Sequence, residues 1–103
     1  MASPMRIRAA AKDGVTEVRV LMSHVMETGQ RKDSSGEVIP AHFITELTAR
    51  HNDKLVLSAE FGPSVSTNPY LAFKFKGGEK GDKVTVSWVD NKGDSRTDEA
   101  QIA

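Results

Sequence analysis

Apolar and polar residues alternate with a period of two along most of this chain, which indicates β-strands rather than helices. Between residues 83 and 90, for example, Val84, Val86 and Trp88 share one face and the positions between them are polar. No segment of useful length has the 3.6-residue period of an amphipathic helix. The same alternation, clear or weakened, recurs in six further segments: 5–9, 15–22, 43–50, 55–61, 71–76 and 95–102.

Turn-forming residues separate these segments. Asp13-Gly14, Asn52-Asp53 and residues 91–94 contain the residue types that tolerate a positive φ in tight hairpins. Short strands with turns at this spacing are typical of a β-sandwich. We therefore expect an all-β fold, an immunoglobulin-like antiparallel β-sandwich of about seven strands, formed by residues 1–103 as one domain.

The apolar positions also predict what lies inside the sandwich. Trp88 and the phenylalanines Phe61, Phe73 and Phe75 are expected to fill its middle. In 55–61, the alternation places Leu55 and Leu57 on the inner face and Val56 on the outer face. The polar segment 95–102 is expected to be an edge strand.

The segment 23–41 has no period and is long for a connection in a compact domain. Connections of this length are usually functional or disordered, so it is either a functional loop or a simple long connector. Its Asp33-Ser34-Ser35-Gly36 predicts a turn, which would fold the segment back as a loose hairpin. Val25, Met26, Val38 and Ile39 are apolar residues that either tuck the segment against the body or meet a partner.

Alternating strand directions predict which loops lie together. Loops at one end of a rigid sandwich form a natural recognition surface. One end should gather 23–41, 62–69 and 91–94, and the other 11–14, 51–53 and 77–82.

Charge and composition exclude several kinds of chemistry. Lys plus Arg number 14 and Asp plus Glu number 14, so no global positive field exists to hold nucleic acid. The chain has no cysteine, which excludes disulfides, a thiolate nucleophile and cysteine-ligated metals. No stretch approaches the 18 apolar residues of a membrane span, and MASPMRIRAA lacks the apolar region of a signal peptide.

Catalytic motifs are equally sparse. The glycine-rich segment 77–83 lacks the order of a phosphate-binding loop and precedes a strand, not a helix. Asp98 and Glu99 point to opposite faces of one strand and cannot flank one bond. Lys74 and Lys76 point to one face of their strand, and Phe73 and Phe75 point to the other. Base stacking on the aromatic rings and contact of phosphates with the lysines could therefore not occur on the same face. We expect no enzyme activity and no nucleic-acid binding.

The three histidines are the remaining candidates for chemistry. His24 and His42 are expected at the same end of the sandwich, with His51 at the other. Two histidines without a placed carboxylate fall short of the three or four ligands of a zinc site. A free-standing β-sandwich metal or redox protein using His24 and His42 is therefore kept as the alternative, beside a secreted adhesive or structural sandwich.

Several motifs along the chain together resemble the SoxZ family of sulfur-oxidation proteins. The resemblance spans about residues 5–102, and it departs from the family at Val25, where proline is common. The motifs are Met22-Ser23-His24, Met26-Glu27-Thr28-Gly29, Ile39-Pro40-Ala41-His42-Phe43-Ile44, Gly62-Pro63 with Val65-Ser66 and Asn68-Pro69, Phe73-Lys74-Phe75-Lys76-Gly77, and Trp88-Val89-Asp90-Asn91-Lys92-Gly93-Asp94.

The resemblance implies a non-catalytic subunit without cofactors or bound metal. SoxZ-like chains form a heterodimer with SoxY, whose C-terminal cysteine carries the sulfur intermediate of thiosulfate oxidation. The complex makes transient contacts with a cytochrome pair, a thiosulfohydrolase and a sulfur dehydrogenase. The resemblance further implies a periplasmic protein that is exported together with SoxY, without a signal peptide of its own, and that binds neither membranes nor nucleic acid.

Residues of the loop end are the candidates for partner binding. The sequence does not decide whether SoxY covers an inner face, the outer face that carries Val56, or the polar edge strand 95–102. The partner-binding candidates are His24, Met26, Arg31, Asn68, Tyr70 and Asn91.

Overall fold

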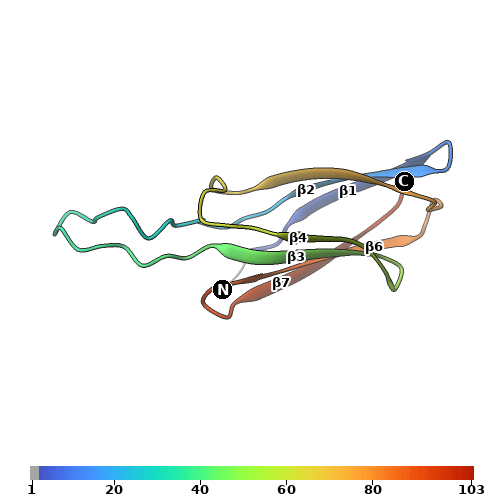
Figure 1. Ribbon diagram of the computed structural model, residues 1–103. Helices are drawn as coiled ribbons and strands as arrows, with labels where there is room; N and C mark the ends of the chain where they lie inside the picture. Colours follow the sequence, from blue (N-terminus) through green and yellow to red (C-terminus); the bar gives the residue numbers. More distant parts are fainter. Residues whose placement is uncertain (1–2) are drawn as a thin grey trace.

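Seven antiparallel strands in two sheets make up the computed structural model, which describes residues 3–103 (Figure 1). One sheet has the order β1-β2-β5 and the other the order β4-β3-β6-β7. The strands are β1 (Arg6–Lys12), β2 (Val15–Leu21), β3 (Ile44–His51), β4 (Lys54–Glu60), β5 (Tyr70–Lys76), β6 (Lys83–Asp90) and β7 (Ser95–Gln101). The predicted all-β sandwich of about seven strands is confirmed.

The core lies between the two sheets, on the faces that the alternation predicts. Val18 pairs with Phe73 across β2 and β5, and Leu47 pairs with Trp88 across β3 and β6. Trp88 is only 2% exposed and is the largest side chain among the fully buried ones. Phe75 is buried, while Phe61 and Phe73 are half-buried against this core.

The expected inner position of Leu55 is wrong. The register of β3 and β4 shifts between Ala49 and Arg50, so Arg50 pairs with Leu55 and Ala49 pairs with Leu57. Val56 is the extra residue at this irregularity, and such a bulge reverses the face of the residues beyond it. Leu55 is consequently exposed, and Val56, expected on the outer face, packs partly against the core.

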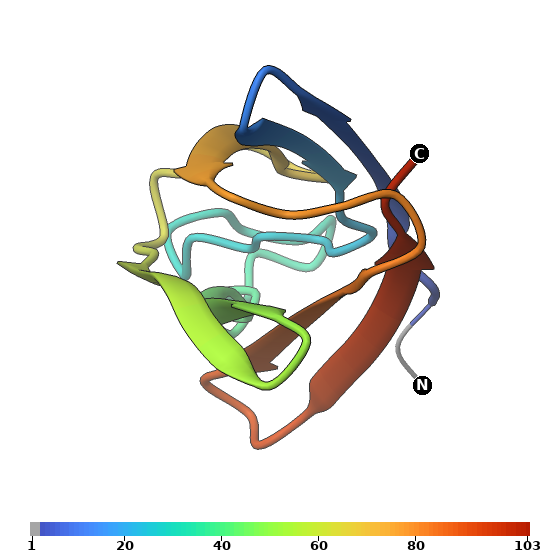
Figure 2. The same ribbon diagram turned by 90° about the vertical axis from the view of Figure 1, so that its right-hand side faces the viewer.

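The sandwich is closed along one side and open along the other. On the closed side, Ala11 and Ala9 exchange main-chain hydrogen bonds with Ala103, and the Met5 N–H donates to Asp98 of β7. β7 is an edge strand there, as predicted. On the other side the edges of β4 and β5 share no main-chain hydrogen bond in the described part of the chain (yellow-green and gold in Figure 2). The two sheets therefore present free edges on this open side.

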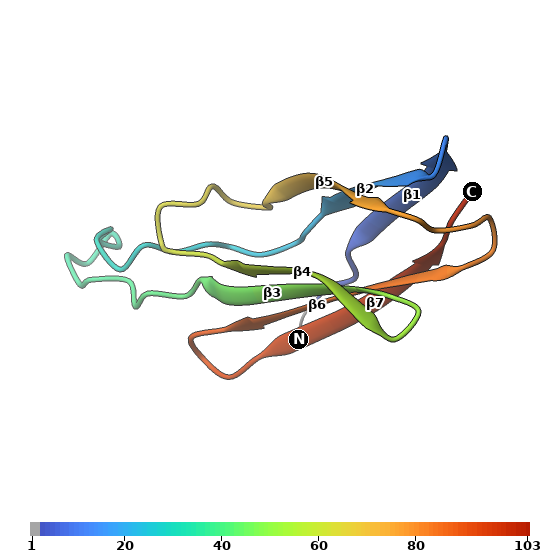
Figure 3. The ribbon, with the colours of Figure 1, turned by 45° about the vertical axis from the view of Figure 1, so that its right-hand side comes forward.

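The segment between β2 and β3 folds back as the predicted hairpin. It projects beyond both sheets (Figure 3), and the molecule measures 54 × 20 × 18 Å. Two isolated bridges, Glu27 to His42 and Lys32 to Val38, hold its two sides together. We call residues 27–42 the arm.

Loops gather at the two ends as the strand directions predict. At the arm end, the His24 carbonyl accepts from the Asn68 N–H and the Phe43 carbonyl accepts from the Asn91 N–H. At the far end, Asn52 donates to Lys83 and Gly77 donates to Gly14 through the main chain. No helix in residues 3–103 is long and apolar enough to span a membrane.

Candidate functional site

A buried carboxylate, Asp90, lies at the arm end of the sandwich. Its Oδ2 lies 3.0 Å from Nε2 of His24 and 2.7 Å from Nε2 of His42. Its Oδ1 accepts the main-chain N–H groups of Lys92 (3.0 Å) and Asp94 (2.9 Å). The carboxylate thus has hydrogen-bond partners on both oxygens, and its side chain has no exposed surface.

Strand alternation explains why these three residues meet. Asp90 ends β6 on the same face as Val86 and Trp88. The chain stays extended beyond β2, so that His24 follows Met22 on the inward side. His42 immediately precedes β3, which is the neighbour of β6. The sheet order brings the three segments to the same end of the core.

The hydrogen bonds fix the proton on His24. Its Nδ1 accepts the main-chain N–H of Met26 at 3.1 Å, so Nδ1 carries no hydrogen. In the neutral ring the proton is then on Nε2, from which it is donated to Asp90. The main-chain N–H of Met26 faces the ring, and Met26 itself has a left-handed φ of 50°.

The environment keeps Asp90 ionised. Burial raises the pKa of this carboxyl group, but the hydrogen bonds from His24, Asp94, His42 and Lys92 outweigh burial and lower the pKa to about 2. Asp90 is therefore a negatively charged acceptor that organises the loops around it.

The three side chains are close enough to be considered as metal ligands. One nitrogen or oxygen atom from each of His24, His42 and Asp90 lies within 4.8 Å of the others. A metal-bound histidine normally donates its other ring N–H to a neighbouring acceptor. Nδ1 of His24 instead faces the N–H of Met26, and binding a metal through Nε2 would leave that ring without a proton. The donor set fits a hydrogen-bonded carboxylate better than a metal centre.

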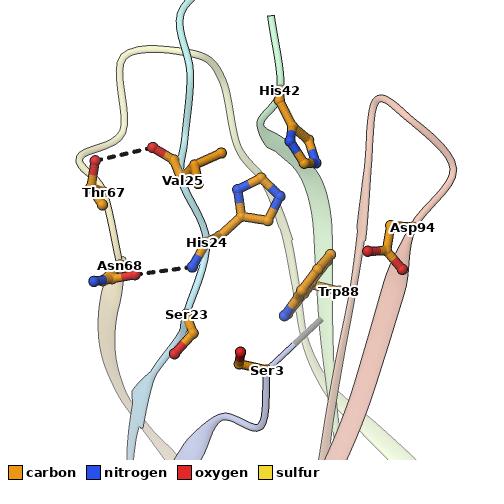
Figure 4. A pocket seen from close by; sticks show the side chains of 9 residues that line it. All are labelled: Ser3, Ser23, His24, Val25, His42, Thr67, Asn68, Trp88 and Asp94. Atoms are coloured by element: carbon orange, nitrogen blue, oxygen red, sulfur yellow. Dashed lines mark hydrogen bonds between the residues drawn. The ribbon is translucent and has the colours of Figure 1, made fainter. Parts of the chain in front are cut away.

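An open pocket of about 400 Å³ lies beside this cluster. Figure 4 shows the side chains that surround it, with the indole of Trp88 and the imidazole of His24 on its inner wall. The two rings contact edge to face, with centroids 5.0 Å apart. The other lining residues are Ser3, Ser23, Val25, His42, Thr67, Asn68 and Asp94.

Three of the six predicted site residues surround the Asp90 cluster. His24 belongs to it. Asn68 holds His24 in place, because its Oδ1 accepts the His24 N–H at 3.0 Å. Asn91 ties the 91–94 turn to the chain before β3, with bonds to Phe43 N (2.8 Å) and Ala41 O (2.8 Å).

The other three candidates lie elsewhere. Met26 is buried, and its sulfur lies 3.4 Å from the Ile44 N–H, so its side chain is part of the core. Arg31 is exposed on the arm, where it pairs with Glu27. Tyr70 is 61% exposed at the start of β5. Arg31 and Tyr70 do not line the pocket. The partner-binding role of all six residues stays a prediction.

The alternation pattern did not single out Asp90 as a site residue. Its position was recognisable, because Val84, Val86, Trp88 and Asp90 continue one face of a strand, where a carboxylate is exceptional. What the alternation cannot reveal is that two histidines from distant segments supply its hydrogen-bond donors. The expectation that His24 and His42 share one end is confirmed by their bonds to the same oxygen.

Comparison with known protein families shows the family to which this chain belongs. The family description "Sulphur oxidation protein SoxZ" matches residues 5–101. This chain belongs to the SoxZ family. The match covers all seven strands, the arm and the Asp90 cluster, and membership of the family supports a role of the protein in sulfur oxidation. No curated protein sequence matches the chain.

Solved structures with a similar fold are more distant in sequence. A hypothetical protein, PH1083 from Pyrococcus horikoshii OT3, has a TM-score of 0.70 at 19% identity, covering 99% of this chain and 89% of its own. A superoxide reductase (neelaredoxin) mutant from Archaeoglobus fulgidus in the reduced form has a TM-score of 0.58 at 24% identity, covering 99% and 90%. At these identities the likeness to the SoxZ domain concerns the fold alone.

Proposed function

We propose that this SoxZ domain is the non-catalytic subunit of a SoxYZ sulfur-carrier complex in periplasmic thiosulfate oxidation. It forms a heterodimer with SoxY, and the C-terminal cysteine of SoxY carries the sulfur intermediate. The family match over residues 5–101 is the observation that carries this proposal. The periplasmic location, and export together with SoxY, belong to the same proposal.

The chemistry of the chain supports a scaffold role. The chain has no cysteine, so the covalent attachment of sulfur falls to the partner. A second thiol beside the carrier cysteine would compete for the cargo by thiol exchange. The buried Asp90 is fully engaged with hydrogen-bond donors, which suits a structural carboxylate better than a general base.

The open side of the sandwich is the surface that best suits SoxY. Leu55 on β4 is 47% exposed and Tyr70 on β5 is 61% exposed. Half-buried Leu57, Leu71 and Phe73 lie on the same two edge strands. Apolar side chains next to free strand edges are covered in most stable proteins, and a partner protein can cover them here.

The arm is a second surface, suited to the pathway enzymes. It extends beyond the sheets (Figure 1). Val38, which pairs with Lys32 in the arm, is exposed, and so is Val25, which precedes the arm in the sequence. A projecting segment of this kind can touch an enzyme without disturbing the SoxY interface. We assign to it the transient contacts with the cytochrome pair, the thiosulfohydrolase and the sulfur dehydrogenase.

Co-purification tests the heterodimer directly. The chain is co-expressed with a SoxY that has a C-terminal cysteine, and the mixture is analysed by size exclusion at micromolar concentration. A single peak with both chains at equal stoichiometry is expected. A SoxY variant with its cysteine changed to serine is the control, because it removes the sulfur attachment and leaves the interface. Separate monomers in both experiments would contradict the proposal.

Metal analysis tests the alternative, a metal or redox protein using His24 and His42. Purified protein is expected to hold less than stoichiometric metal, since Nδ1 of His24 accepts an N–H bond. A tightly bound metal at one equivalent that the His42→Gln variant loses would favour the alternative.

A further inference from the structure

The outer face of the β1-β2-β5 sheet carries an excess of positive charge. Every second residue of these strands packs toward the core, so the residues between them point away from the other sheet, on the outer side of the upper layer in Figure 3. The whole chain has 14 cationic and 14 acidic residues, but this face has six cations and one carboxylate. The cations are Arg6, Arg8, Lys12, Arg19, Lys74 and Lys76, and the carboxylate is Glu17. We call this surface the basic face.

The strand register places two like charges directly opposite each other on the basic face. Arg8 of β1 pairs with Arg19 of β2, and like charges in this position lower the stability of a sheet. Among residues 3–103, four of the six cations have no ion-pair partner: Arg6, Arg8, Lys12 and Lys76. The chain therefore leaves most of this positive charge uncompensated, which is typical of a surface that meets negative charge on a partner.

The row of the basic face nearest the arm end adds apolar contact area. Leu21 pairs with Arg6 on one side and with Tyr70 on the other. Leu21 is 42% exposed and Tyr70 is 61% exposed. Arginine and tyrosine are both enriched in protein–protein interfaces. Exposed apolar side chains beside arginines thus favour a protein as the occupant.

The position of Glu17 argues against a phosphate polymer or a lipid surface. Glu17 lies between Ala10 and Lys74 in the middle of the face, 2.9 Å from Arg19 and 3.9 Å from Lys74. Closely spaced phosphates would meet this carboxylate, whereas a protein surface can place its own carboxylates on either side of it.

The size of the basic face is that of a transient contact. Seven residues at about 3.3 Å each and three strands about 4.8 Å apart give a surface about 20 Å long and about 10 Å wide before side chains are added. Interfaces at this small end bind weakly, and charge then governs the rate of encounter more than the affinity.

We propose that the basic face docks an acidic surface of a partner protein in a weak complex that salt dissociates. Carboxylates of the partner pair with Arg8 and its cationic neighbours, and an apolar side chain contacts Leu21. This inference goes beyond the proposed function, because it concerns neither the body of the arm nor the free strand edges, and it defines the partner by charge alone.

An acidic peptide serves as the probe for this surface. A capped peptide of four glutamates around one leucine is added to ¹⁵N-labelled protein, and the amide resonances are followed. Resonances of β1, β2 and β5 should move and saturate, while those of β3 and β6 stay in place. Raising sodium chloride from about 50 mM to about 300 mM should weaken binding at least fivefold, because the contacts are between exposed charges.

Charge reversal locates the contact. The double variant Arg8→Glu with Arg19→Glu should lose at least tenfold in peptide affinity. Lys54→Glu with Lys80→Glu is the matched control: it changes the net charge equally, at exposed positions off the basic face, and should lose less than about twofold. Glu17→Gln should instead bind the peptide about twofold to threefold more tightly, because Arg19 and Lys74 are released. This gain is measurable even if the double variant does not fold.

Four results would overturn the inference. One is a peptide that leaves the resonances of β1, β2 and β5 unmoved. Another is an equal loss of affinity in the two double variants, which would reduce the effect to net charge. The third is tighter binding of hexathymidylate than of the peptide, which would make the face a nucleic-acid surface. The fourth is co-sedimentation with phosphatidylglycerol vesicles that the peptide does not reverse, which would make it a membrane surface.

Discussion

At the scale of single residues, the arm end is organised by one charge. On folding, the Asp90 carboxylate gives up its hydrogen bonds with water. It accepts hydrogen bonds from two imidazole rings and two main-chain N–H groups in their place. Each donor comes from a different position along the chain, so the carboxylate links the segment after β2, the segment before β3 and the 91–94 turn. His24 and His42 also line the pocket beside Trp88, so their bonds to Asp90 hold this part of the pocket wall in place.

Asp90 should make the protein sensitive to acid. Its pKa falls from 3.8 to about 2 on folding, so the folded state favours the ionised form. The stabilisation is present above pH ~4 and is lost as the pH falls from ~4 to ~2, and it amounts to about 2 kcal/mol. Asp90→Asn should lose about 3 kcal/mol of unfolding free energy at pH 7, because an amide group then faces donors.

Urea unfolding of both proteins between pH 7 and pH 2.5 measures this effect. The stability difference between Asp90→Asn and the unchanged chain should shrink as the pH falls. Asp53→Asn, a change in the exposed 51–53 turn, is the control and should unfold like the unchanged chain at each pH. A difference that stays constant over the whole range would contradict the role of the ionised carboxylate.

Trp88 should be the costliest core residue to truncate. It is 2% exposed and belongs to the core cluster between the sheets, so Trp88→Ala leaves a large cavity. We expect a loss of about 3 to 5 kcal/mol in the free energy of unfolding, measured by urea denaturation. Val89→Ala, its half-exposed neighbour on the other face of β6, should cost less than about 1 kcal/mol. Equal losses for the two would mean that the inner face is wrongly assigned.

At the scale of elements, the arm and the sandwich are separable. Residues 30–38 are exposed throughout, and the core cluster draws no buried residue from them. The arm is held by its two isolated bridges and by the ion pair between Arg31 and Glu27. Its shape is therefore suited to contacts with other proteins, and we expect the sandwich to fold without it.

Shortening the arm tests this independence. Residues 29–40 are replaced by Asn-Gly, which closes a two-residue hairpin between Thr28 and Ala41. The unfolding free energy should change by less than about 1 kcal/mol, because no core residue is lost. Binding to SoxY, measured by size exclusion, should persist, while binding to the pathway enzymes should weaken. A loss of several kcal/mol in the unfolding free energy would show that the arm contributes to the core.

At the scale of the whole molecule, the asymmetry between the two sides of the sandwich matters most. β1 and the C-terminal residues close one side through main-chain hydrogen bonds. The other side has the edges of β4 and β5 and the exposed Leu55 and Tyr70. A monomer would leave this apolar edge in water, whereas a heterodimer would cover it.

A charge on the open side should separate binding from folding. Leu55→Glu places a carboxylate in the proposed interface and should weaken SoxY binding at least tenfold, since an unpaired interface charge costs about 1.4 kcal/mol or more. Its own unfolding free energy should change by less than about 1 kcal/mol, because Leu55 is 47% exposed.

Thr97→Glu provides the matched control for Leu55→Glu. Thr97 is exposed on β7, at the closed side of the sandwich. This variant should bind SoxY like the unchanged chain in the same titration. If Thr97→Glu weakens binding and Leu55→Glu does not, SoxY docks on the β7 side.

The sequence by itself determined the strands, their faces and most of the core. Alternation is a local property, so Val84, Val86 and Trp88 could be assigned to the inner face without knowing their neighbours. The turn residues placed most strand ends within one residue, although the first strand, expected over 5–9, runs from Arg6 to Lys12. The strand directions then predicted which loops share an end. The motif pattern also indicated the SoxZ family that the comparison confirms.

Only the tertiary structure decided the features that depend on contacts between distant segments. The bulge that turns Leu55 outward arises from the pairing of β3 with β4, which no alternation within β4 records. Asp90 is stabilised inside the protein because His24 and His42, 66 and 48 residues away along the chain, bring their ring nitrogens to the same oxygen. The unpaired N–H of Trp88 likewise becomes apparent only when every neighbouring acceptor is in place, since hydrogen bonding is decided by position in space and not by order along the chain.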